Sequence, residues 1–211
     1  MTPDFRSFAA ACARIGLELP EDRYRLLCRY ADLLLDWNRR VNLVSRQDTG
    51  RVLSYHVIDS LAAQSLVPAG ARAGDIGTGA GLPGIPLAIA RPDCEFLLVE
   101  SVRKKTEFLS LVLDELRLAN AGVIHDRAED IPPLDCDTVL SRLTGPTPKT
   151  LPRLAAHART TGTVVLYKSP AAAPDLPAGL LRKLRLRVAR TEDLRLPLTG
   201  LPRRFIVLAS A

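Results

Sequence analysis

From residue 71 onward, stretches typical of β-strands alternate with stretches typical of amphipathic helices, and this alternation limits the fold more than any other feature. Strands separated by helices pair in parallel, because each helical crossover returns the chain to the same end of the sheet. The alternation therefore predicts an α/β fold with a mostly parallel sheet covered on both faces. The clearest amphipathic stretch is Arg103–Leu118. The expected strands are Ala71–Ile76, Glu95–Glu100, Ala121–His125, Thr138–Ser141 and Thr163–Lys168.

The end of the chain departs from this alternation. Leu181–Ala189 alternates apolar with basic residues, and Arg204–Ala209 has the composition of a second short strand. No helical pattern lies between them, so we expect an antiparallel edge hairpin with Lys183, Arg185 and Arg187 on one face of its first strand. Five parallel strands followed by such a hairpin indicate a Rossmann-like class I methyltransferase sheet rather than a dinucleotide dehydrogenase.

The first part of the chain has helical periodicity instead. Apolar side chains recur there at steps of three and four residues, which indicates the buried stripe of a helix. They are Tyr24, Leu27, Cys28, Ala31, Leu34 and Leu35. Pro68 and Gly70 close this region. We therefore expect an N-terminal helical extension over residues 1–68 and the sheet domain over residues 69–211.

The charge of the chain favours a polyanionic partner. The net charge is +6, and only five of the 29 Lys and Arg residues are lysines. The guanidinium group is a planar fork of donors that suits phosphates and guanine edges. A GC-rich genome, which encodes arginine in place of lysine, is the alternative cause of this composition. The four cysteines form no C-x-x-C pair and the apolar runs are short, so we expect a cytoplasmic protein without a membrane segment.

The strongest motif is the glycine-rich segment from Asp75 to Gly84, which follows an expected strand. Glycines let the backbone approach a ligand closely, and the start of the next helix offers free N–H donors. The spacing of Gly79, Gly81 and Gly84 also fits a dinucleotide fingerprint, which is a weak signal alone. Gly77 extends the run, and Asp75 precedes it where a carboxylate can reach a cationic methionine group. These two residues favour S-adenosylmethionine.

Charged residues follow the later strands, at the edge where open parallel sheets bind ligands. Glu100 ends the second strand, where a carboxylate can accept the ribose hydroxyls of a nucleoside. Ala128 and Glu129 follow the third strand, where an adenine ring sits in this architecture. Arg142 and Lys168 end the fourth and fifth strands, so we expect both to border the substrate and Arg142 also to contact the cofactor. The alternative for each is an ordinary solvated charge.

The chemistry of methyl transfer narrows the target atom. The fourth strand is followed by Ser141-Arg-Leu-Thr-Gly-Pro rather than by the Asn/Asp-Pro-Pro-aromatic loop typical of amine methylation. Methylation of a pyrimidine carbon needs a cysteine nucleophile, and Cys136 precedes the fourth strand. Guanine N7 needs only positioning, because its lone pair is free at neutral pH. The three histidines are scattered without ligand spacing, so we expect no metal.

Several strings together resemble the small-subunit ribosomal RNA methyltransferase G family, also called glucose-inhibited division protein B. They are Trp37-Asn-Arg-Arg-Val-Asn-Leu, His56-Val-Ile-Asp-Ser-Leu, the glycine segment, Lys104-Lys105 with Phe108-Leu109, and Ser141-Arg142. The resemblance implies methylation of guanine N7 at one position of bacterial small-subunit rRNA by S-adenosylmethionine. It also implies cofactor contacts at Gly77, Leu82, Ala128, Glu129 and Arg142.

The chain departs from this family on the substrate side. Leu143-Thr-Gly-Pro replaces the usual alanine and aromatic residue after Arg142, and Ser169 replaces a glycine. Other readings stay open at this point. A small-molecule methyltransferase of the same fold predicts activity without RNA. A nicotinamide oxidoreductase predicts nicotinamide binding. A non-catalytic RNA-binding protein predicts RNA binding without the cofactor.

Overall fold

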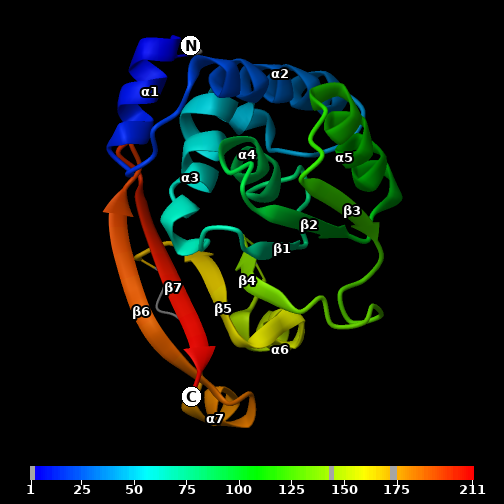
Figure 1. The fold of residues 1–211 in the computed structure, drawn as a ribbon, viewed down its shortest axis with the longest axis vertical. Helices are drawn as coiled ribbons and strands as arrows, with labels where there is room; N and C mark the ends of the chain where they lie inside the picture. Colours follow the sequence, from blue (N-terminus) through cyan, green and yellow to red (C-terminus); the bar gives the residue numbers. More distant parts are fainter. Residues whose placement is uncertain (1–2, 143–144, 172–174) are drawn as a thin grey trace.

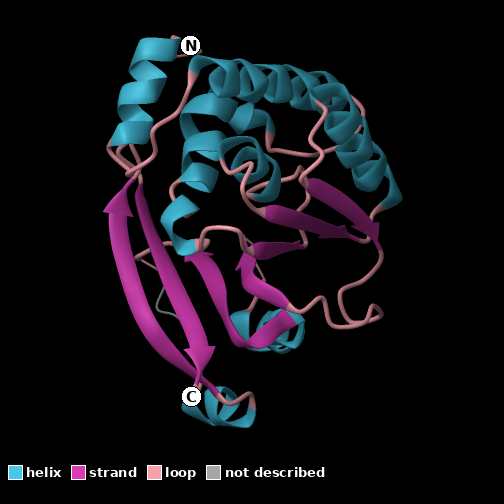
Figure 2. Ribbon diagram, viewed as in Figure 1, coloured by secondary structure: helices cyan, strands magenta, loops and turns pink. Residues whose placement is uncertain are grey.

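A seven-stranded sheet organises the chain (Figures 1 and 2). The computed structural model describes residues 3–142, 145–171 and 175–211. From one edge to the other, the strands are β3 (Ala121–His125), β2 (Glu95–Glu100), β1 (Arg72–Ile76), β4 (Cys136–Ser141), β5 (Ala158–Lys168), β7 (Pro202–Ser210) and β6 (Leu186–Arg195). β1 to β5 are mutually parallel, and β7 is antiparallel to both of its neighbours, β5 and β6. The predicted five parallel strands and edge hairpin are confirmed.

The strand order places a ligand crevice at the middle of the sheet. The chain moves outward from β1 to β2 and β3, then returns to the other side of β1 with β4 and β5. At such a reversal the connections leave neighbouring strands in opposite directions, which opens a crevice beyond their carboxyl ends. Here the reversal lies between β1 and β4, so the residues after these strands face the crevice.

Both faces of the sheet are covered, as the alternation predicts. Side chains within a strand belong in turn to two hydrophobic clusters, as Leu98 and Val99 do on β2. One cluster contains α4 (Gly84–Ala90), α5 (Arg103–Leu116) and the N-terminal helices, and the other contains α6 (Thr147–His157). Figure 1 shows α6 on the opposite side of the sheet from α4 and α5.

The N-terminal helices pack into the core of the sheet domain. They are α1 (Phe5–Ala13), α2 (Glu21–Asn38), a 3-10 segment (Arg46–Arg51), a π-helical segment (Val52–Val57), α3 (Ile58–Leu61) and a 3-10 turn (Gln64–Leu66). The same hydrophobic cluster contains Leu27 and Tyr30 of α2 together with Phe96 of β2. The Tyr30 hydroxyl donates to the Ala80 carbonyl at 2.7 Å. The two predicted parts therefore share a core, and the division at residue 68 stays a prediction.

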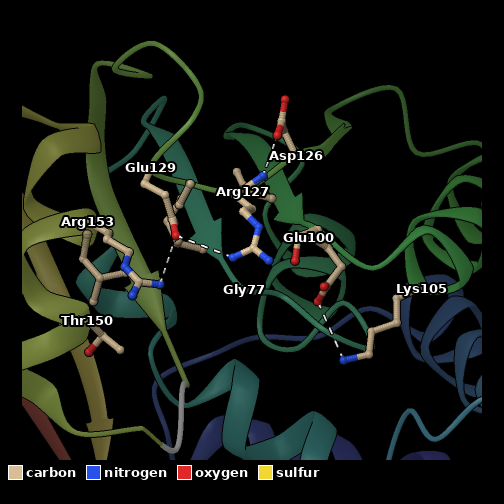
Figure 3. Close-up of a pocket in the computed structure, with 13 residues that line it drawn as sticks. Gly77, Glu100, Lys105, Asp126, Arg127, Glu129, Thr150 and Arg153 are labelled. Carbon is tan, nitrogen blue, oxygen red and sulfur yellow. Dashed lines mark hydrogen bonds and ion pairs between the residues drawn. The ribbon is translucent and has the colours of Figure 1, made fainter.

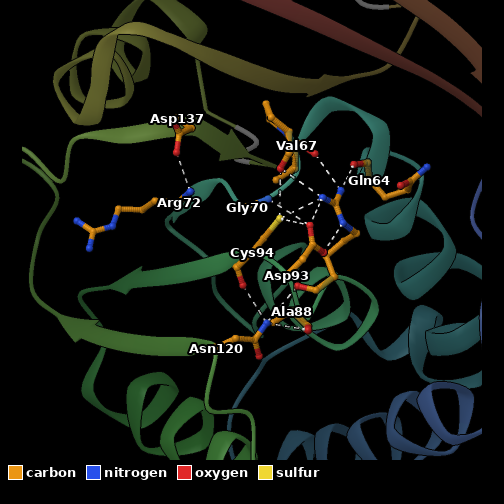
Figure 4. A network of polar contacts seen from close by, with 11 residues as sticks. Gln64, Val67, Gly70, Arg72, Ala88, Asp93, Cys94, Asn120 and Asp137 are labelled. Carbon is orange, nitrogen blue, oxygen red and sulfur yellow. Dashed lines mark hydrogen bonds and ion pairs between the residues drawn. The ribbon is translucent and has the colours of Figure 1, made fainter.

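Arg91 ties the end of the extension to the sheet domain through contacts with Gln64, Val67 and Asp93, which Figure 4 labels. Its Nη1 donates to the carbonyls of Gln64 at 3.0 Å and Val67 at 2.9 Å, and its Nη2 lies 2.7 Å from Asp93 Oδ2. Nearby, the Asn120 amide donates to the Arg91 carbonyl at 3.2 Å. These contacts add side-chain donors to carbonyls at the end of the last helical turn of the extension, where the Gln64 carbonyl also accepts from the Val67 amide at 3.3 Å. They fix the amino-terminal edge of the sheet, away from the crevice.

The first strand of the hairpin begins later than predicted. Residues Ala178–Lys183 form helix α7, Arg185 adopts a left-handed backbone with φ 53°, and β6 begins at Leu186. The expectation that Lys183, Arg185 and Arg187 share one strand face is therefore wrong. Leu180 and Leu184 pack against the hydrophobic cluster that contains α6. Their four-residue spacing suits a helical turn. This packing overrides the local alternation.

Candidate functional site

The glycine segment forms a tight turn between β1 and α4. The Gly77 and Thr78 amides both donate to the Val99 carbonyl, at 2.9 and 3.1 Å, so the turn is attached to the end of β2. Gly81 has φ +88°, and a Cβ there would lie 2.3 Å from Ile85 Cδ1. A Cβ on Gly84 would lie 2.2 Å from Leu98 Cδ2. Both positions need glycine because the turn packs directly on α4 and β2.

Asp75 holds this turn from below and keeps one oxygen available. Its Oδ2 accepts from the Thr78 hydroxyl at 2.6 Å and from the Gly84 amide at 2.8 Å. Within the described part of the chain, its buried Oδ1 has no hydrogen-bond partner. Burial raises the pKa of this carboxyl to about 6. A fully buried acceptor without a donor is costly, and a cationic ligand group at Oδ1 would relieve that cost.

Glu100 joins the turn to the end of β2. Its Oε2 accepts from the Gly79 amide at 3.1 Å, and its Oε1 accepts from the Val102 amide at 2.9 Å. Lys105 Nζ lies 3.9 Å from Oε2. Each carboxylate oxygen has a second lone pair, so both can still accept from a ligand. The two backbone bonds hold the carboxylate in one orientation, as recognition of a vicinal diol requires.

A cavity of about 310 Å³ opens beside Glu100 (Figure 3). It receives residues from the ends of β1 and β2, from the loop after β3, and from α5 and α6. The described residues that line it are Ile76, Gly77, Val99, Glu100, Ser101, Lys105, Asp126, Arg127, Ala128, Glu129, Thr150, Arg153 and Leu154. Its location at the carboxyl ends of the central strands and its size suit a nucleoside ligand.

Four of the predicted cofactor residues line this cavity directly: Gly77, Glu100, Ala128 and Glu129. The other predicted turn residues are Asp75, Gly79 and Leu82. They lie in or under the glycine turn, where the Leu82 amide donates to the Thr78 carbonyl at 3.1 Å.

Helix α6 supplies cavity residues that the sequence interpretation missed. Thr150, Arg153 and Leu154 all line the cavity. Arg153 Nη1 lies 3.6 Å from Glu129 Oε1, and Arg127 Nη1 approaches the same oxygen at 3.9 Å (Figure 3). The three- and four-residue spacing of Thr150, Arg153 and Leu154 is the sequence signal that places them on one face of α6.

Arg142 and Lys168 lie at the same edge of the sheet, but neither is among the described residues that line the cavity. Arg142 Nη2 lies 3.1 Å from Asp59 Oδ2, and its Nη1 donates to Ser60 Oγ at 3.2 Å. Lys168 ends β5, and burial lowers the pKa of its ammonium. Leu143 and Thr144, where the chain departs from the family, lie outside the described residues.

Asp59 links this edge to the N-terminal helices, and the sequence interpretation gave it no role. It is fully buried on α3 and accepts from Arg203 Nε at 2.6 Å and Arg203 Nη2 at 2.8 Å. Arg203 comes from β7, so three distant segments meet at one carboxylate. Two guanidinium groups thus share Asp59 at the mouth of the crevice, which leaves this cluster with a net positive charge.

Among residues 3–142, 145–171 and 175–211, no group of His, Cys, Asp or Glu residues is arranged to hold a metal ion. In the same part of the chain, no helix has the length and apolarity needed to cross a membrane.

Comparison with known proteins decides the family. Residues 23–183 match the family described as rRNA small subunit methyltransferase G. The chain belongs to this family. A methyltransferase G of Azoarcus sp. (strain BH72) is 35% identical over 99% of this chain and 98% of its own length. The methyltransferases G of Chlorobium limicola and Laribacter hongkongensis are 44% and 48% identical. These matches span 65% and 59% of the two relatives, so the chain matches less than two thirds of their length.

Solved structures confirm the predicted class I methyltransferase fold. A SAM-dependent methyltransferase from Aquifex aeolicus has a TM-score of 0.56 at 17% identity, covering 76% of this chain and 93% of its own. TYW2 of M. jannaschii, in complex with AdoMet, has a TM-score of 0.58 at 14% identity, covering 74% and 76%. At such low identities the likeness concerns the fold alone.

Proposed function

We propose that this chain transfers the methyl group of S-adenosylmethionine to N7 of a guanine in small-subunit ribosomal RNA, in the cytoplasm. The observation that carries the proposal is the match over nearly the whole length of a methyltransferase G relative. The site supports it independently, because a glycine turn and a fixed carboxylate border one nucleoside-sized cavity.

The residues around the cavity suit each part of the cofactor. The free Asp75 oxygen suits an ammonium group, and the Glu100 carboxylate suits the ribose hydroxyls. Ala128 and Glu129 border the part of the cavity that suits adenine. The Ala128 carbonyl lies 2.8 Å from His157 Nε2, and this contact holds the loop after β3 in place. Gly77, Gly79 and Leu82 shape the turn beside it. When bound, the cofactor supplies an electrophilic methyl group on a sulfonium.

The chain's own task is then to bring the target base to that methyl group. Guanine N7 is a nucleophile without deprotonation, so orientation and exclusion of water are sufficient. Arg142 and Lys168 border the position of the base, where cations suit its oxygen acceptors and the RNA phosphates. A cysteine mechanism is disfavoured because burial raises the pKa of Cys136 to about 12 at the opposite end of β4.

RNA phosphates have suitable donors on the N-terminal helices. Arg39, Arg40 and Arg46 are exposed at and beyond the end of α2, and the Arg40 guanidinium lies 5.5 Å from the centre of the Trp37 ring. Trp37 in turn packs against Phe108 of α5, with ring centres 5.9 Å apart. Lys105, on the same helix as Phe108, lines the cavity, so this basic end of α2 is connected through α5 to the cavity, and we propose that it binds RNA phosphates.

The target atom is tested by chemical cleavage. Small-subunit RNA or particles from cells lacking the gene, incubated with the protein and S-adenosylmethionine, are expected to gain one site cleaved by borohydride and aniline. Methylation of N7 puts a positive charge on the purine and weakens its glycosidic bond, which makes that nucleotide cleavable. Incorporated methyl groups with resistant RNA would exclude N7 alone. Methylation of a small molecule but of no RNA would favour a small-molecule methyltransferase.

Replacing Glu100 with glutamine is expected to weaken S-adenosylmethionine binding about tenfold, since bonds to a charged acceptor exceed those to a neutral amide by ~1–1.5 kcal/mol. Calorimetry measures the change. Glu95→Gln is a matched control on the same strand, because Glu95 is exposed and pairs with Arg72 at 2.8 Å, away from the cavity. Equal affinity of the Glu100 variant and wild type would remove Glu100 from the site.

A further inference from the structure

We propose that His56 and Asp48 are positioning residues that hold Arg142 in its working orientation at the crevice. The inference rests on the proposed role of Arg142 beside the substrate. It assigns a task to the segment His56-Val-Ile-Asp-Ser, which precedes the sheet domain and contributes no residue to the cavity lining described above.

Three side chains of this segment converge on one guanidinium, and the His56 carbonyl also accepts from Arg142 Nη1 at 3.5 Å. Arg142 Nη2 lies 3.3 Å from His56 Nδ1 and 3.1 Å from Asp59 Oδ2, while its Nη1 donates to Ser60 Oγ at 3.2 Å. Ser60 Oγ is itself held by donating to the His56 carbonyl at 2.7 Å. The spacing is that of one helical turn, so residues 56, 59 and 60 face the same way.

The arginine dictates which nitrogen of His56 carries the proton. A guanidinium group only donates, so Nδ1 must accept and the proton must sit on Nε2. Nε2 is buried without a hydrogen-bond partner among the described residues, and it lies 3.5 Å from Asp48 Oδ2, close enough for electrostatic attraction. Burial and the neighbouring Arg142 charge lower the pKa of His56 to about 4, so the ring stays neutral at physiological pH.

Asp48 is anchored on the segment between α2 and α3. Its Oδ2 accepts from Ser45 Oγ at 2.6 Å, and its Oδ1 accepts from Arg51 Nε at 2.8 Å. The Asp48 carboxylate therefore faces the Nε2 side of the His56 ring at 3.5 Å, and Arg142 contacts the Nδ1 side at 3.3 Å. In the proposal, this attraction to the Nε2 proton keeps the ring turned with Nδ1 toward Arg142.

A neutral imidazole is suited to this task. Asp59 already shares its single charge between Arg142 and Arg203. A second carboxylate beside Arg142 would cancel the positive charge that an RNA substrate needs. Histidine adds an acceptor without adding a negative charge. An arginine side chain has many rotamers, and a misplacement of about 1 Å can lower the rate by two orders of magnitude. An acceptor that holds the guanidinium group in one position therefore favours catalysis.

The test compares two substitutions, each of which keeps a polar atom at the position of only one ring nitrogen of His56. In His56→Asn, the side-chain oxygen can replace Nδ1 as the acceptor for Arg142. In His56→Gln, the amide reaches the Nε2 position, and the acceptor near Arg142 is lost. We expect kcat/KM for methyl transfer to RNA to stay within about threefold of wild type in the Asn variant and to fall about tenfold in the Gln variant, the loss of roughly one hydrogen bond to a charged group.

A double variant shows whether the effect passes through Arg142. If it does, His56→Gln costs no further activity in an Arg142→Ala background. Equal or higher activity of the Gln variant than of the Asn variant, or a double variant whose losses multiply, would overturn the proposal. If His56 served only to fill space, the Gln variant would be at least as active as the Asn variant, because glutamine is closer to histidine in size.

Asp48→Asn gives a second test should substitutions at buried position 56 prevent folding. We expect a loss of about threefold that disappears in the Arg142→Ala background; an unchanged rate, or a loss that persists there, counts against the proposal. Asp22→Asn is the matched control, since Asp22 is exposed and pairs with Arg23 at 3.8 Å.

Full activity of Arg142→Ala would remove the proposed role of Arg142 and this inference with it. An inactive Arg142→Ala beside active His56→Gln would remove only this inference.

Discussion

Replacing Arg142 with alanine will lower the turnover of methyl transfer about a hundredfold, as expected for loss of a preorganised charge at a reaction site, with a much smaller effect on stability. The fold tolerates the change because Asp59 keeps its bidentate partner. Arg203 still donates to both Asp59 oxygens, at 2.6 and 2.8 Å, so the buried carboxylate is not left without a donor. We expect the free energy of unfolding to fall by about 1 kcal/mol.

Arg203→Ala is the matched control, and the order of its effects should reverse. Asp59 is fully buried, and losing its two shortest bonds should cost about 3 kcal/mol of stability. Single-turnover methylation and urea denaturation of both variants measure the two effects. If Arg142→Ala unfolds at a lower urea concentration than Arg203→Ala, then Arg142 is chiefly structural and its proposed role is wrong.

Local patterns were sufficient to predict that the candidate cofactor residues lie close together. The glycine segment, Asp75 and Glu100 lie within 26 residues of one another, on two strands whose parallel pairing follows from the helix between them. Once β1 and β2 are known to be adjacent, their carboxyl ends must meet. The contact between Glu100 and the Gly79 amide is therefore a consequence of topology that the sequence already contains.

The substrate side depends on contacts that no local pattern encodes. Asp59 and Arg203 are 144 residues apart, and their pairing requires the hairpin to return beside β5 and the N-terminal helices to pack against it. The same limit explains the error at α7. Whether residues 181–184 form a strand or a helix is decided by the apolar surface beneath the sheet, which is assembled from β4, β5 and α6.

The N-terminal helices contribute side chains to the cluster around Arg142. Asp59 and His56 belong to them, yet both contact Arg142 at the end of β4. The core is shared as well, since Leu27 and Tyr30 belong to the same hydrophobic cluster as Phe96 of the sheet. A fragment that begins at residue 69 would expose this apolar surface and leave Arg142 without its acidic partner.

Asp75→Asn will weaken S-adenosylmethionine binding at pH 7 by roughly 10- to 100-fold, the value of a bond between two charged groups, and will abolish its pH dependence. The carboxyl has a raised pKa of about 6 because it is buried. It is therefore neutral at pH 5 and charged at pH 7, and only the charged form attracts an ammonium group. Wild-type affinity should accordingly rise between pH 5 and 7, and binding near pH 6 should release a proton.

Stability should change in the opposite direction. An unfolded aspartate ionises near pH 4, but the folded one resists ionisation until about pH 6. The contribution of Asp75 to the free energy of unfolding should therefore fall as the pH rises from 4 to 6. His56, whose pKa is lowered to about 4, contributes in the opposite sense over this range, so the Asp75 contribution is measured as the difference between wild type and the asparagine variant. Urea denaturation of both proteins between pH 4 and 6 measures that difference, and calorimetry between pH 5 and 7 measures binding. Methylthioadenosine is the control ligand because it has no amino acid group, and it should bind wild type and variant with equal affinity at every pH. If Asp75→Asn instead weakens the binding of methylthioadenosine as much as that of S-adenosylmethionine, then Asp75 acts only by shaping the glycine turn.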